Sequence, residues 1–448
     1  MLTPEAALDR AVQLVENAKK AGADAADAVY LCDASTEVQV RLGVLEDVVR
    51  SEGEDIGLRV FLGQRSATIS SSSMNPDVLA GLVERALDMA REAPEDQFAG
   101  LAPQDMLLKG TPPAIDSDDD QDPDPHSLRE AALACEDAAR AVVGVTNSEG
   151  AGASAGRSIF ALATSHGFAG VSHASGYGLS ASVLAGEGDD KQRDYDWRSA
   201  RHRADLDSAE AIGRRAGERA VRRLNPGSVK SGAMPVIFDP RIGSSLVSHL
   251  IGAIGGSNIA RKTSFLLESL GEALFDSAIS IIDDPLRVRG LGSRAFDGEG
   301  LPTARSAIIE KGVLTGWLLE SAAARQLGLK PTGHASRGGS GAPGTSPANV
   351  HLEGGTLSVA ELIADIDYGV YVHELSGQGV NGVTGDYSRG AGGFLIEKGE
   401  ITTPVAEFTI ASNLKDMYRA LTAANDLEFV RSTNVPTLRV DGMMVASA

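Results

Sequence analysis

A histidine beside a glutamate is the first pattern in this sequence that could do chemistry. A zinc hydrolase needs about three protein ligands, commonly two histidines on one helical face, and a carboxylate that activates the metal-bound water. His373 and Glu374 form the only such dipeptide, but no second histidine follows, and Gly377 and Gly379 disfavour a helix there. His249 lies in a helix predicted over residues 244–254, with no other His, Cys, Asp or Glu three to five residues away on that helix. We therefore predict no metal ligand and no catalytic residue in this chain.

Residues 152–156 match the GxSxG pattern of serine hydrolases, with Ser154 at the nucleophile position. That nucleophile sits on a sharp turn between a strand and a helix. Residues 157–163 instead alternate like a strand, and a stretch rich in Gly, Ser and Ala produces such matches by chance. We interpret this segment as a strand.

Residues 377–382 match the GxGxxG pattern and follow a strand-like run over residues 368–373. A dinucleotide site needs a helix N-terminus directly afterwards to receive the pyrophosphate, but residues 384–390 have the composition of a turn. The run Arg261-Lys262-Thr263 lacks the glycine that precedes the lysine of a phosphate loop. No nucleotide cofactor is expected.

The first half of the chain alternates between helical and strand patterns. Thr3 and Pro4 are a good N-cap and first helical position, and apolar residues then recur at helical spacing. Apolar and polar residues alternate around residues 37–42 and 56–62, as in half-buried antiparallel strands. Further helices are predicted after Asn75, after Ser127 and over residues 207–224, and a strand meander is predicted over residues 144–203.

The second half is predicted to be mainly β, with short helices over residues 244–254 and 322–327. Two similar segments, residues 308–314 and 395–401, each predict a hairpin with a tight Lys-Gly turn. Residues 333–355 are rich in glycine and predict a flexible lid or a disordered tip. We predict an α+β protein. Residues 1–227 would form an N-terminal domain of helices on an antiparallel sheet, and residues 228–448 a mainly β domain of barrel or sandwich type.

An acidic segment interrupts the first half at residues 109–125. It lacks the ligand register of a calcium loop, so a mobile, solvated surface loop is the favoured interpretation. After it, Ser127 and Glu130 are spaced to form a capping box for the next helix.

Composition narrows the class of protein. The chain has 448 residues, 42% hydrophobic and 23% charged, which are ordinary values for a folded globular protein. Its net charge of -20 repels nucleic-acid phosphates and anionic lipids, and no apolar run is long enough to span a bilayer. Only Cys32 and Cys135 are present, too few for a disulfide framework. We expect a cytoplasmic protein with buried thiols and no direct contact with nucleic acid or membrane.

Four longer motifs carry a resemblance to a known family. They are the glycine-rich run of residues 290–300, the run of residues 377–381, the run of residues 384–391, and Ile410-Ala411 with Asn413-Leu414-Lys415-Asp416-Met417. Together they resemble signatures of the TldD/PmbA family, and the later motifs are similar to its PmbA (TldE) branch, once called modulators of DNA gyrase. The similarity spans nearly the whole chain.

The resemblance implies a cytoplasmic partner of a TldD-type subunit. In that family the TldD subunit holds zinc through a helical HExxxH motif and a downstream Cys, and the pair acts as a metallopeptidase on modified or unfolded peptides. Alignment places Val247, Ser248 and Gly252 where TldD has His, Glu and His, and residues 432–434 offer no Cys. The resemblance therefore implies zinc in the partner and no cofactor in this chain.

Our first hypothesis is a non-catalytic subunit that closes a chamber over the partner's zinc and holds an extended peptide. The residues expected to shape that chamber are Gly377, Gln378, Gly379, Asn381, Asp386, Tyr387, Ser388 and Arg389. A glycine turn that only fixes the fold explains the same residues equally well.

Two alternatives stay open. One is a non-catalytic binding protein of the gyrase-modulator type, which captures a peptide or protein regulator without a protease partner. The other is an independent hydrolase that uses His373 and Glu374 with ligands from elsewhere in the fold. The sequence also leaves a homodimer possible.

Overall fold

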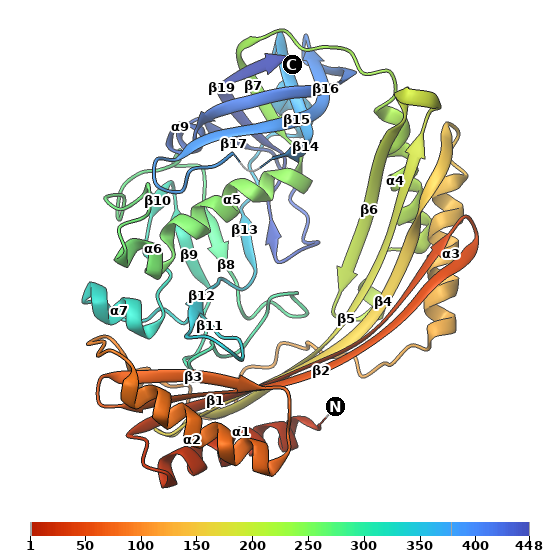
Figure 1. The fold of residues 1–448 in the computed structure, drawn as a ribbon. Coiled ribbons are helices and arrows are strands. Elements are labelled where there is room, and N and C mark those ends of the chain that lie inside the picture. Colours follow the sequence, from red (N-terminus) through yellow and green to blue (C-terminus); the bar gives the residue numbers. More distant parts are fainter. Residues whose placement is uncertain (1, 378, 448) are drawn as a thin grey trace.

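The computed structural model describes residues 2–377 and 379–447, and its first six strands form one antiparallel sheet that curves like half a bowl (Figure 1). The strands lie in the order β3-β2-β1-β4-β5-β6. Four of them are long, between 17 and 20 residues. Their bounds are β1 Ala25–Arg41, β2 Val44–Leu62, β3 Arg65–Ser71, β4 Val145–Thr164, β5 Ala169–Ala185 and β6 Gln192–Ala200.

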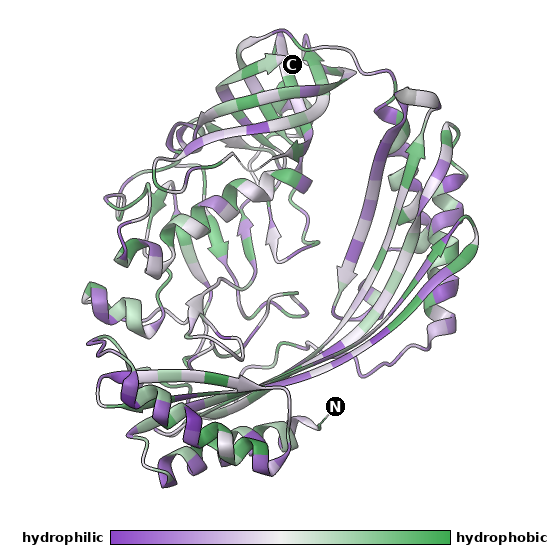
Figure 2. Ribbon diagram, in the orientation of Figure 1, coloured by the Kyte–Doolittle hydropathy of each residue, from purple (hydrophilic) through white to green (hydrophobic). Residues whose placement is uncertain are grey.

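Four helices cover the convex face of this sheet in two pairs (Figure 1). They are α1 Pro4–Lys20 with α2 Pro76–Glu92 at one end, and α3 Pro125–Arg140 with α4 Ala209–Arg222 at the other. Each helix presents apolar residues to the sheet, and apolar and polar residues alternate around α1 and α2 in Figure 2. The predicted cap of the first helix is confirmed, because the Thr3 hydroxyl accepts a hydrogen bond from Ala6 N at 3.3 Å. Cys32 and Cys135 are buried as expected.

The second half builds a small closed barrel. Five strands follow one another in the order β16-β15-β14-β7-β19, and β16 also pairs with β19 to close the ring. Their bounds are β7 Gly232–Phe238, β14 Tyr368–Ser376, β15 Asp386–Glu397, β16 Glu400–Asn413 and β19 Leu438–Ser447, with β17 Leu421–Ala423 added to β19. The predicted α+β class with a barrel-type β domain is confirmed.

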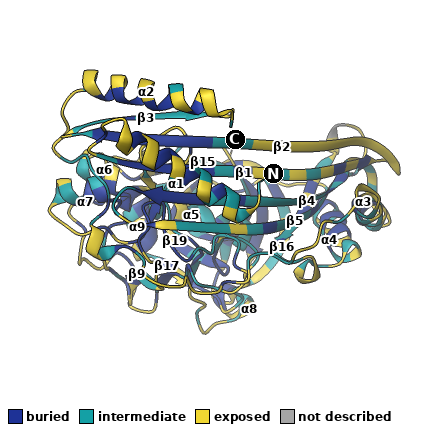
Figure 3. Cartoon of the chain, turned by 90° about the horizontal axis from the view of Figure 1, so that it is seen from below, coloured by how far each residue is buried: buried dark blue, intermediate teal, exposed yellow. Residues whose placement is uncertain are grey.

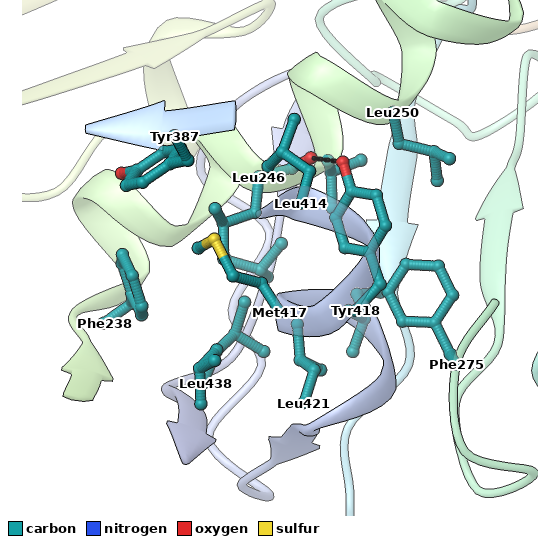
Figure 4. Packing of buried hydrophobic residues seen from close by; sticks show 14 of the residues in the cluster. Phe238, Leu246, Leu250, Phe275, Tyr387, Leu414, Met417, Tyr418, Leu421 and Leu438 are labelled. Atoms are coloured by element: carbon teal, nitrogen blue, oxygen red, sulfur yellow. Dashed lines mark hydrogen bonds between the residues drawn. The ribbon is translucent and has the colours of Figure 1, made fainter. Parts of the chain in front are cut away.

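Helix α5, Pro240–Ile254, packs against this barrel through the largest apolar core of the described chain. Figure 4 shows Leu246 and Leu250 of α5 beside Tyr418 of α9, Leu414–Arg419. The buried Tyr418 hydroxyl donates to the Leu246 carbonyl at 3.0 Å, so its only polar group is satisfied. This core fixes α5 relative to the barrel.

A smaller sheet with the order β10-β9-β8-β13-β18 lies beside the barrel. The Lys-Gly turn between β9 and β10 has φ of 47° at Lys311 and 84° at Gly312, and the corresponding turn at Lys398 and Gly399 has 52° and 79°. Both predicted hairpins are therefore confirmed. The remaining elements are β8 Ile281–Asp283, β9 Ser306–Glu310, β10 Val313–Leu314, β11 Ala335–Ser336, β12 Gly344–Thr345, β13 Val350–Leu352, β18 Thr433–Asn434, α6 Gly256–Ala260, α7 Ser321–Leu327, α8 Val359–Ile363 and the 3-10 turns Gln104–Met106, Gly188–Asp190 and Arg203–Asp205.

Two predicted loops differ from expectation. Residues 333–355 are neither a lid nor a disordered tip, because they contain β11, β12 and β13 and bury Arg337 against the first sheet. The acidic segment is irregular as predicted but not free in solvent, since Asp119 accepts hydrogen bonds from the Tyr177 hydroxyl and from Arg203 N. Repeated glycines and acids indicated mobility, but specific partners hold both segments.

The predicted capping box is also wrong. Helix α3 begins one turn earlier than expected, because Asp124 is its N-cap and accepts a hydrogen bond from Ser127 N at 2.8 Å. We retain the domain division after residue 227 as a proposal. It lies between the end of α4 at Arg222 and the start of β7 at Gly232.

Candidate functional site

Half of the predicted site residues lie in the connection between β14 and β15 and half at the start of β15, and polar side chains stabilise the turn itself. The Asn381 side-chain oxygen accepts hydrogen bonds from Val383 N at 2.9 Å and Thr384 N at 3.3 Å. Asp386 accepts from the Thr384 hydroxyl at 2.7 Å and from Asn413 Nδ2 at 3.2 Å. These hydrogen bonds, first that of Thr384, lower the pKa of Asp386. Asp386 is therefore an ionised, exposed carboxylate already held by its neighbours.

Glycine is required in this connection by close approach of the backbone. A Cβ on Gly379 would lie 1.7 Å from the Ser388 carbonyl oxygen, and Ser388 N donates to the Gly379 carbonyl at 2.6 Å. Gly377 has a φ of 76°, which favours glycine. Gln378 lies outside the described residues. Among the described residues, a turn and then strand β15 follow these glycines, as the sequence predicted.

Strand β15 directs the remaining predicted site residues to two opposite faces. Asp386 and Ser388 are exposed, whereas Tyr387 between them is buried. The Tyr387 ring lies 6.2 Å from the ring of His249 on α5, and neither the Tyr387 hydroxyl nor His249 Nε2 has a hydrogen-bond partner in the described structure. Burial, and then the nearby Arg389, lower the pKa of His249. The structure thus brings Tyr387, Arg389 and His249 together and separates them from Asp386 and Ser388.

Helix α5 carries the three positions that the alignment matches to the zinc-binding motif. The Val247 side chain is apolar and buried, and the Ser248 hydroxyl donates to the Ser244 carbonyl at 3.0 Å within the same helix. Gly252 has no side chain, and an added Cβ would meet nothing within 4 Å. This donor set does not fit zinc, which takes nitrogen, thiolate or carboxylate ligands.

His373 and Glu374 lie on strand β14, so the prediction that they are not helical is confirmed. Glu374 forms an ion pair with Arg223, the C-cap residue of α4, and His373 Nε2 lies 3.7 Å from Asp194 of β6. Asp194 also pairs with Arg241 at 2.8 Å. Burial, and then Arg223, lower the pKa of His373 to about 3. We call these five residues the His373 network; it joins the barrel to the first sheet.

A cavity of about 670 Å³ lies on the concave face of the first sheet and is lined by residues of β1, β2, β4, β5 and β6. On β4, β5 and β6, the residues that alternate with the helix-covered core point into it. Most of those on β4 and β5 are small, and β6 adds Tyr195 and Trp197: the small ones are Gly152, Ser154, Gly178, Ser180 and Ser182. Three carboxylates, Glu37, Glu46 and Glu149, also line the cavity. We call this cavity the trough. The strand interpretation of residues 152–156 is confirmed, since Ser154 lies inside β4 rather than on a strand-to-helix turn.

Two cavities of about 270 Å³ each adjoin the trough, since Ser199 also lines one and Arg198 the other. The first holds four arginines, and Arg431 lines both. The Arg431 guanidinium lies 4.9 Å from the centre of the Trp197 ring, so the second half of the chain contacts the concave face here. The sequence analysis missed these arginines because they come from distant segments. The alternation of Asp194 and Asp196 with Tyr195 and Trp197 was the signal that could have indicated a two-faced strand.

Comparison with known proteins agrees with this architecture. Profiles of the PmbA/TldA metallopeptidase family match domain 1 over residues 26–90, the central domain over residues 118–224 and the C-terminal domain over residues 231–447. The chain is 37% identical over 423 residues to metalloprotease PmbA from Escherichia coli O157:H7, covering 94% of this chain and 92% of that protein. It is 35% identical to a metalloprotease PmbA homolog from Haemophilus influenzae, covering 96% and 94% of the two chains.

Solved structures show the same fold. A putative modulator of DNA gyrase from Bacteroides thetaiotaomicron superposes with a TM-score of 0.92 at 28% identity, covering 100% of both chains. TldE from Thermococcus kodakarensis superposes with a TM-score of 0.86 at 22% identity, covering 97% and 99%. The fold and the three matched domains define an α+β protein of the metallopeptidase class. The chain belongs to the PmbA/TldA metallopeptidase family, on its PmbA (TldE) branch, which confirms the resemblance seen in the sequence.

Proposed function

We propose that this chain is the non-zinc subunit of a TldD/TldE-type metalloprotease that degrades or trims unfolded or modified peptides. The observation that carries the proposal is the state of α5. Val247, Ser248 and Gly252 supply no zinc ligand at the positions aligned with the TldD motif, while the fold of the family is kept. A chain without a metal-bound water or a base to activate it contributes by positioning the peptide and excluding solvent.

The trough supports a role in holding an extended peptide. Most of its floor on β4 and β5 consists of glycine, serine and alanine, so few side chains there obstruct a bound chain, and the carboxylates Glu37, Glu46 and Glu149 line it as well. The exposed residues at the start of β15, Asp386 and Ser388, would then face the partner or the peptide at the rim of the chamber. The expected zinc belongs to the TldD-type partner, and we place both subunits in the cytoplasm.

The test mixes this chain with its TldD-type relative from the same organism. We expect the chain alone to carry less than stoichiometric zinc and to cleave neither casein nor a peptide, and we expect cleavage when the two are combined. Co-purification of the pair should accompany the activity. Absence of both a complex and cleavage in the mixture contradicts the subunit role.

A non-catalytic binding protein is the second candidate. The solved relative from Bacteroides thetaiotaomicron is described as a putative modulator of DNA gyrase, and the trough could hold a peptide without any protease. Pull-downs that recover a peptide or protein regulator but no HExxxH-bearing relative favour this function.

The independent hydrolase is disfavoured by the His373 network. The Glu374 carboxylate is engaged by Arg223, and the His373 ring packs 5.2 Å from the Phe394 ring. Stoichiometric zinc in the pure chain, with peptidase activity that His373→Ala abolishes, would establish this function and overturn ours.

A further inference from the structure

One of the two cavities beside the trough is lined by four arginines and one aspartate. They are Arg201, Arg287, Arg289 and Arg431 with Asp205, and Ser199 of β6 connects this cavity to the trough. We call this cavity the arginine pocket. Its positive charge stands out in a chain with a net charge of -20, in which acidic partners are abundant.

The four guanidinium groups differ in how many ion pairs and hydrogen bonds they form within the chain. Arg289 pairs with Asp116 at 2.6 Å and with Asp205 at 3.2 Å. Arg201 donates to the Ser175 and Leu291 carbonyls, and Arg431 donates to the Arg241 carbonyl. None of Arg201, Arg287 and Arg431 has a carboxylate within 4 Å among the described residues. Three cations in one pocket are thus left without an anion.

Arg287 is the least satisfied of the three. Its guanidinium donates no hydrogen bond to any described protein group, and its Cζ lies 3.5 Å from the centre of the Phe429 ring. Such a stack holds the planar group in place while its N–H edge stays available for a ligand. Burial also lowers the pKa of Arg201 and of Arg431, so both are desolvated cations that an anion would stabilise.

We propose that the arginine pocket binds a carboxylate of the extended peptide in the trough, either the C-terminal carboxylate or a Glu or Asp side chain. The inference rests on the proposed function for the identity of the ligand as a peptide. Guanidinium groups bind carboxylates through paired, charge-assisted hydrogen bonds, which suits a pocket of this size beside a floor that contributes little selectivity. The pocket would fix the position of the peptide along the trough.

The test uses fluorescence anisotropy with the whole chain at low salt and three labelled ten-residue peptides of Gly, Ser and Ala. One has a free C-terminal carboxylate, one a C-terminal amide, and one a C-terminal amide with a single Glu. The variants are Arg287→Gln, the charge-conserving Arg287→Lys, and Arg129→Gln as a control of equal charge change on an exposed position of α3. Thermal unfolding checks that each variant is folded.

We expect Arg287→Gln to weaken binding of a carboxylate-bearing peptide about tenfold, the effect of losing one charge-assisted hydrogen bond. The amide peptide without Glu should bind the wild-type chain as weakly as the carboxylate-bearing peptides bind Arg287→Gln. Arg129→Gln should not change the affinity for any of the three peptides. The two amide peptides distinguish the C-terminal carboxylate from a side chain. Equal binding of all three peptides, no effect of Arg287→Gln, or no detectable binding at millimolar peptide overturns the proposal.

Inorganic phosphate serves as a competitor in the same assay. If phosphate binds in the pocket and the chain shows no preference among the three peptides, the pocket is a phosphate site, and this outcome also overturns the proposal. Binding is measured without the partner, so its outcome is separate from that of the subunit role. Carboxylate-dependent binding with no cleavage in the mixture contradicts only the subunit role.

Discussion

Two of the contacts between the second half of the chain and the curved sheet differ in how far water reaches them. At one end Arg337 enters the sheet and pairs with Asp27, which also pairs with Arg59; the exposed fractions of the Arg337 and Asp27 side chains are 0% and 3%. At the other end lies the His373 network, in which the Glu374 side chain is 46% exposed. The first contact is dry and the second is partly open to water.

The backbone shows the same difference. At the Arg337 contact the two halves approach so closely that a Cβ on Gly57 of β2 would lie 2.0 Å from the Gly339 carbonyl oxygen. In the His373 network the contacts are made by side chains that bridge a wider space. Between the two contacts, the concave face of the part of the sheet that α3 and α4 cover from behind is open and forms the trough. We infer that the Arg337 contact fixes the two halves, while the trough is kept free for a ligand.

Removal of Arg337 should have the largest effect on stability. Burial raises the pKa of Asp27, but Arg337 and Arg59 together outweigh it and lower that pKa below the ordinary value. Arg337→Ala leaves the buried Asp27 with one cation fewer, and we expect a loss of about 3–5 kcal/mol in the free energy of unfolding. Urea unfolding measures it. Arg305→Ala, which breaks an exposed pair with Glu353, should cost about 0–1 kcal/mol.

The matching test is Asp27→Asn in the Arg337→Ala background. Asp27 still pairs with the buried Arg59 there, so Asp27→Asn leaves Arg59 without its carboxylate, and the double variant should be less stable than Arg337→Ala. A double variant that is more stable than Arg337→Ala contradicts the pairing of Asp27 with Arg59.

The close approach of the backbones gives the next largest effect. Gly57→Ala forces a methyl group against the Gly339 carbonyl, and we expect a loss of about 1–3 kcal/mol. Gly53 lies on the same strand, and a Cβ there would meet nothing within 4 Å. Gly53→Ala is therefore the control and should change stability by less than about 0.5 kcal/mol. Equal effects of the two substitutions would show that the halves do not touch at Gly57.

The His373 network predicts a pH dependence between pH 6.5 and pH 4, whereas the lowered pKa of Asp27 places the pH dependence of the Arg337 contact below about pH 4. The pKa of His373 is about 3 in the folded chain against an ordinary value of 6.5, so folding disfavours the protonated ring. Its contribution is present above pH 6.5 and is lost as the pH falls from 6.5 towards 3. We expect the stability difference between wild type and His373→Gln to fall by up to about 1.4 kcal/mol per pH unit in that window.

Denaturant unfolding at a series of pH values measures this difference. His126→Gln changes an exposed histidine of α3 and serves as the control substitution. A difference between wild type and His373→Gln that does not vary between pH 6.5 and pH 4 contradicts the burial of the ring in its neutral form.

The smallest effect is expected in the open middle of the sheet. Gly176 lies on β5, and a Cβ there would meet nothing within 4 Å. Gly176→Ala should change the free energy of unfolding by less than about 0.5 kcal/mol. A cost similar to that of Gly57→Ala would mean that the second half also packs against the middle of the sheet.

The sequence predicted the helices well, but it underestimated the strands. Thr3, Asn75 and the helical spacing of apolar residues placed α1 and α2 correctly, because capping and burial of one face act locally. Only part of β1 and β2 was predicted, since residues 44–53 are exposed on both faces and carry no alternation. Figure 3 shows this end of β2 in the exposed colour. Such a segment is a strand because β1 pairs with it.

Strand geometry also explains why the structure separates the predicted site residues. Residues 386–389 are adjacent in sequence, but a strand sends neighbours to opposite faces, so Tyr387 and Arg389 face α5 while Asp386 and Ser388 face away. The glycines of residues 333–355 indicated flexibility, but Gly339 is there because the chain passes directly over β2.

The sequence by itself determined the family, the α+β class and the loss of the zinc-binding side chains at Val247, Ser248 and Gly252, because these are properties of residue identity and local pattern. Only the tertiary structure decided that His373 and Glu374 join two parts of the protein, and that Arg201, Arg287 and Arg431 share one pocket. These groups come from segments far apart in the chain. Their meeting depends on how the curved sheet and the barrel pack together, which no local pattern of residues specifies.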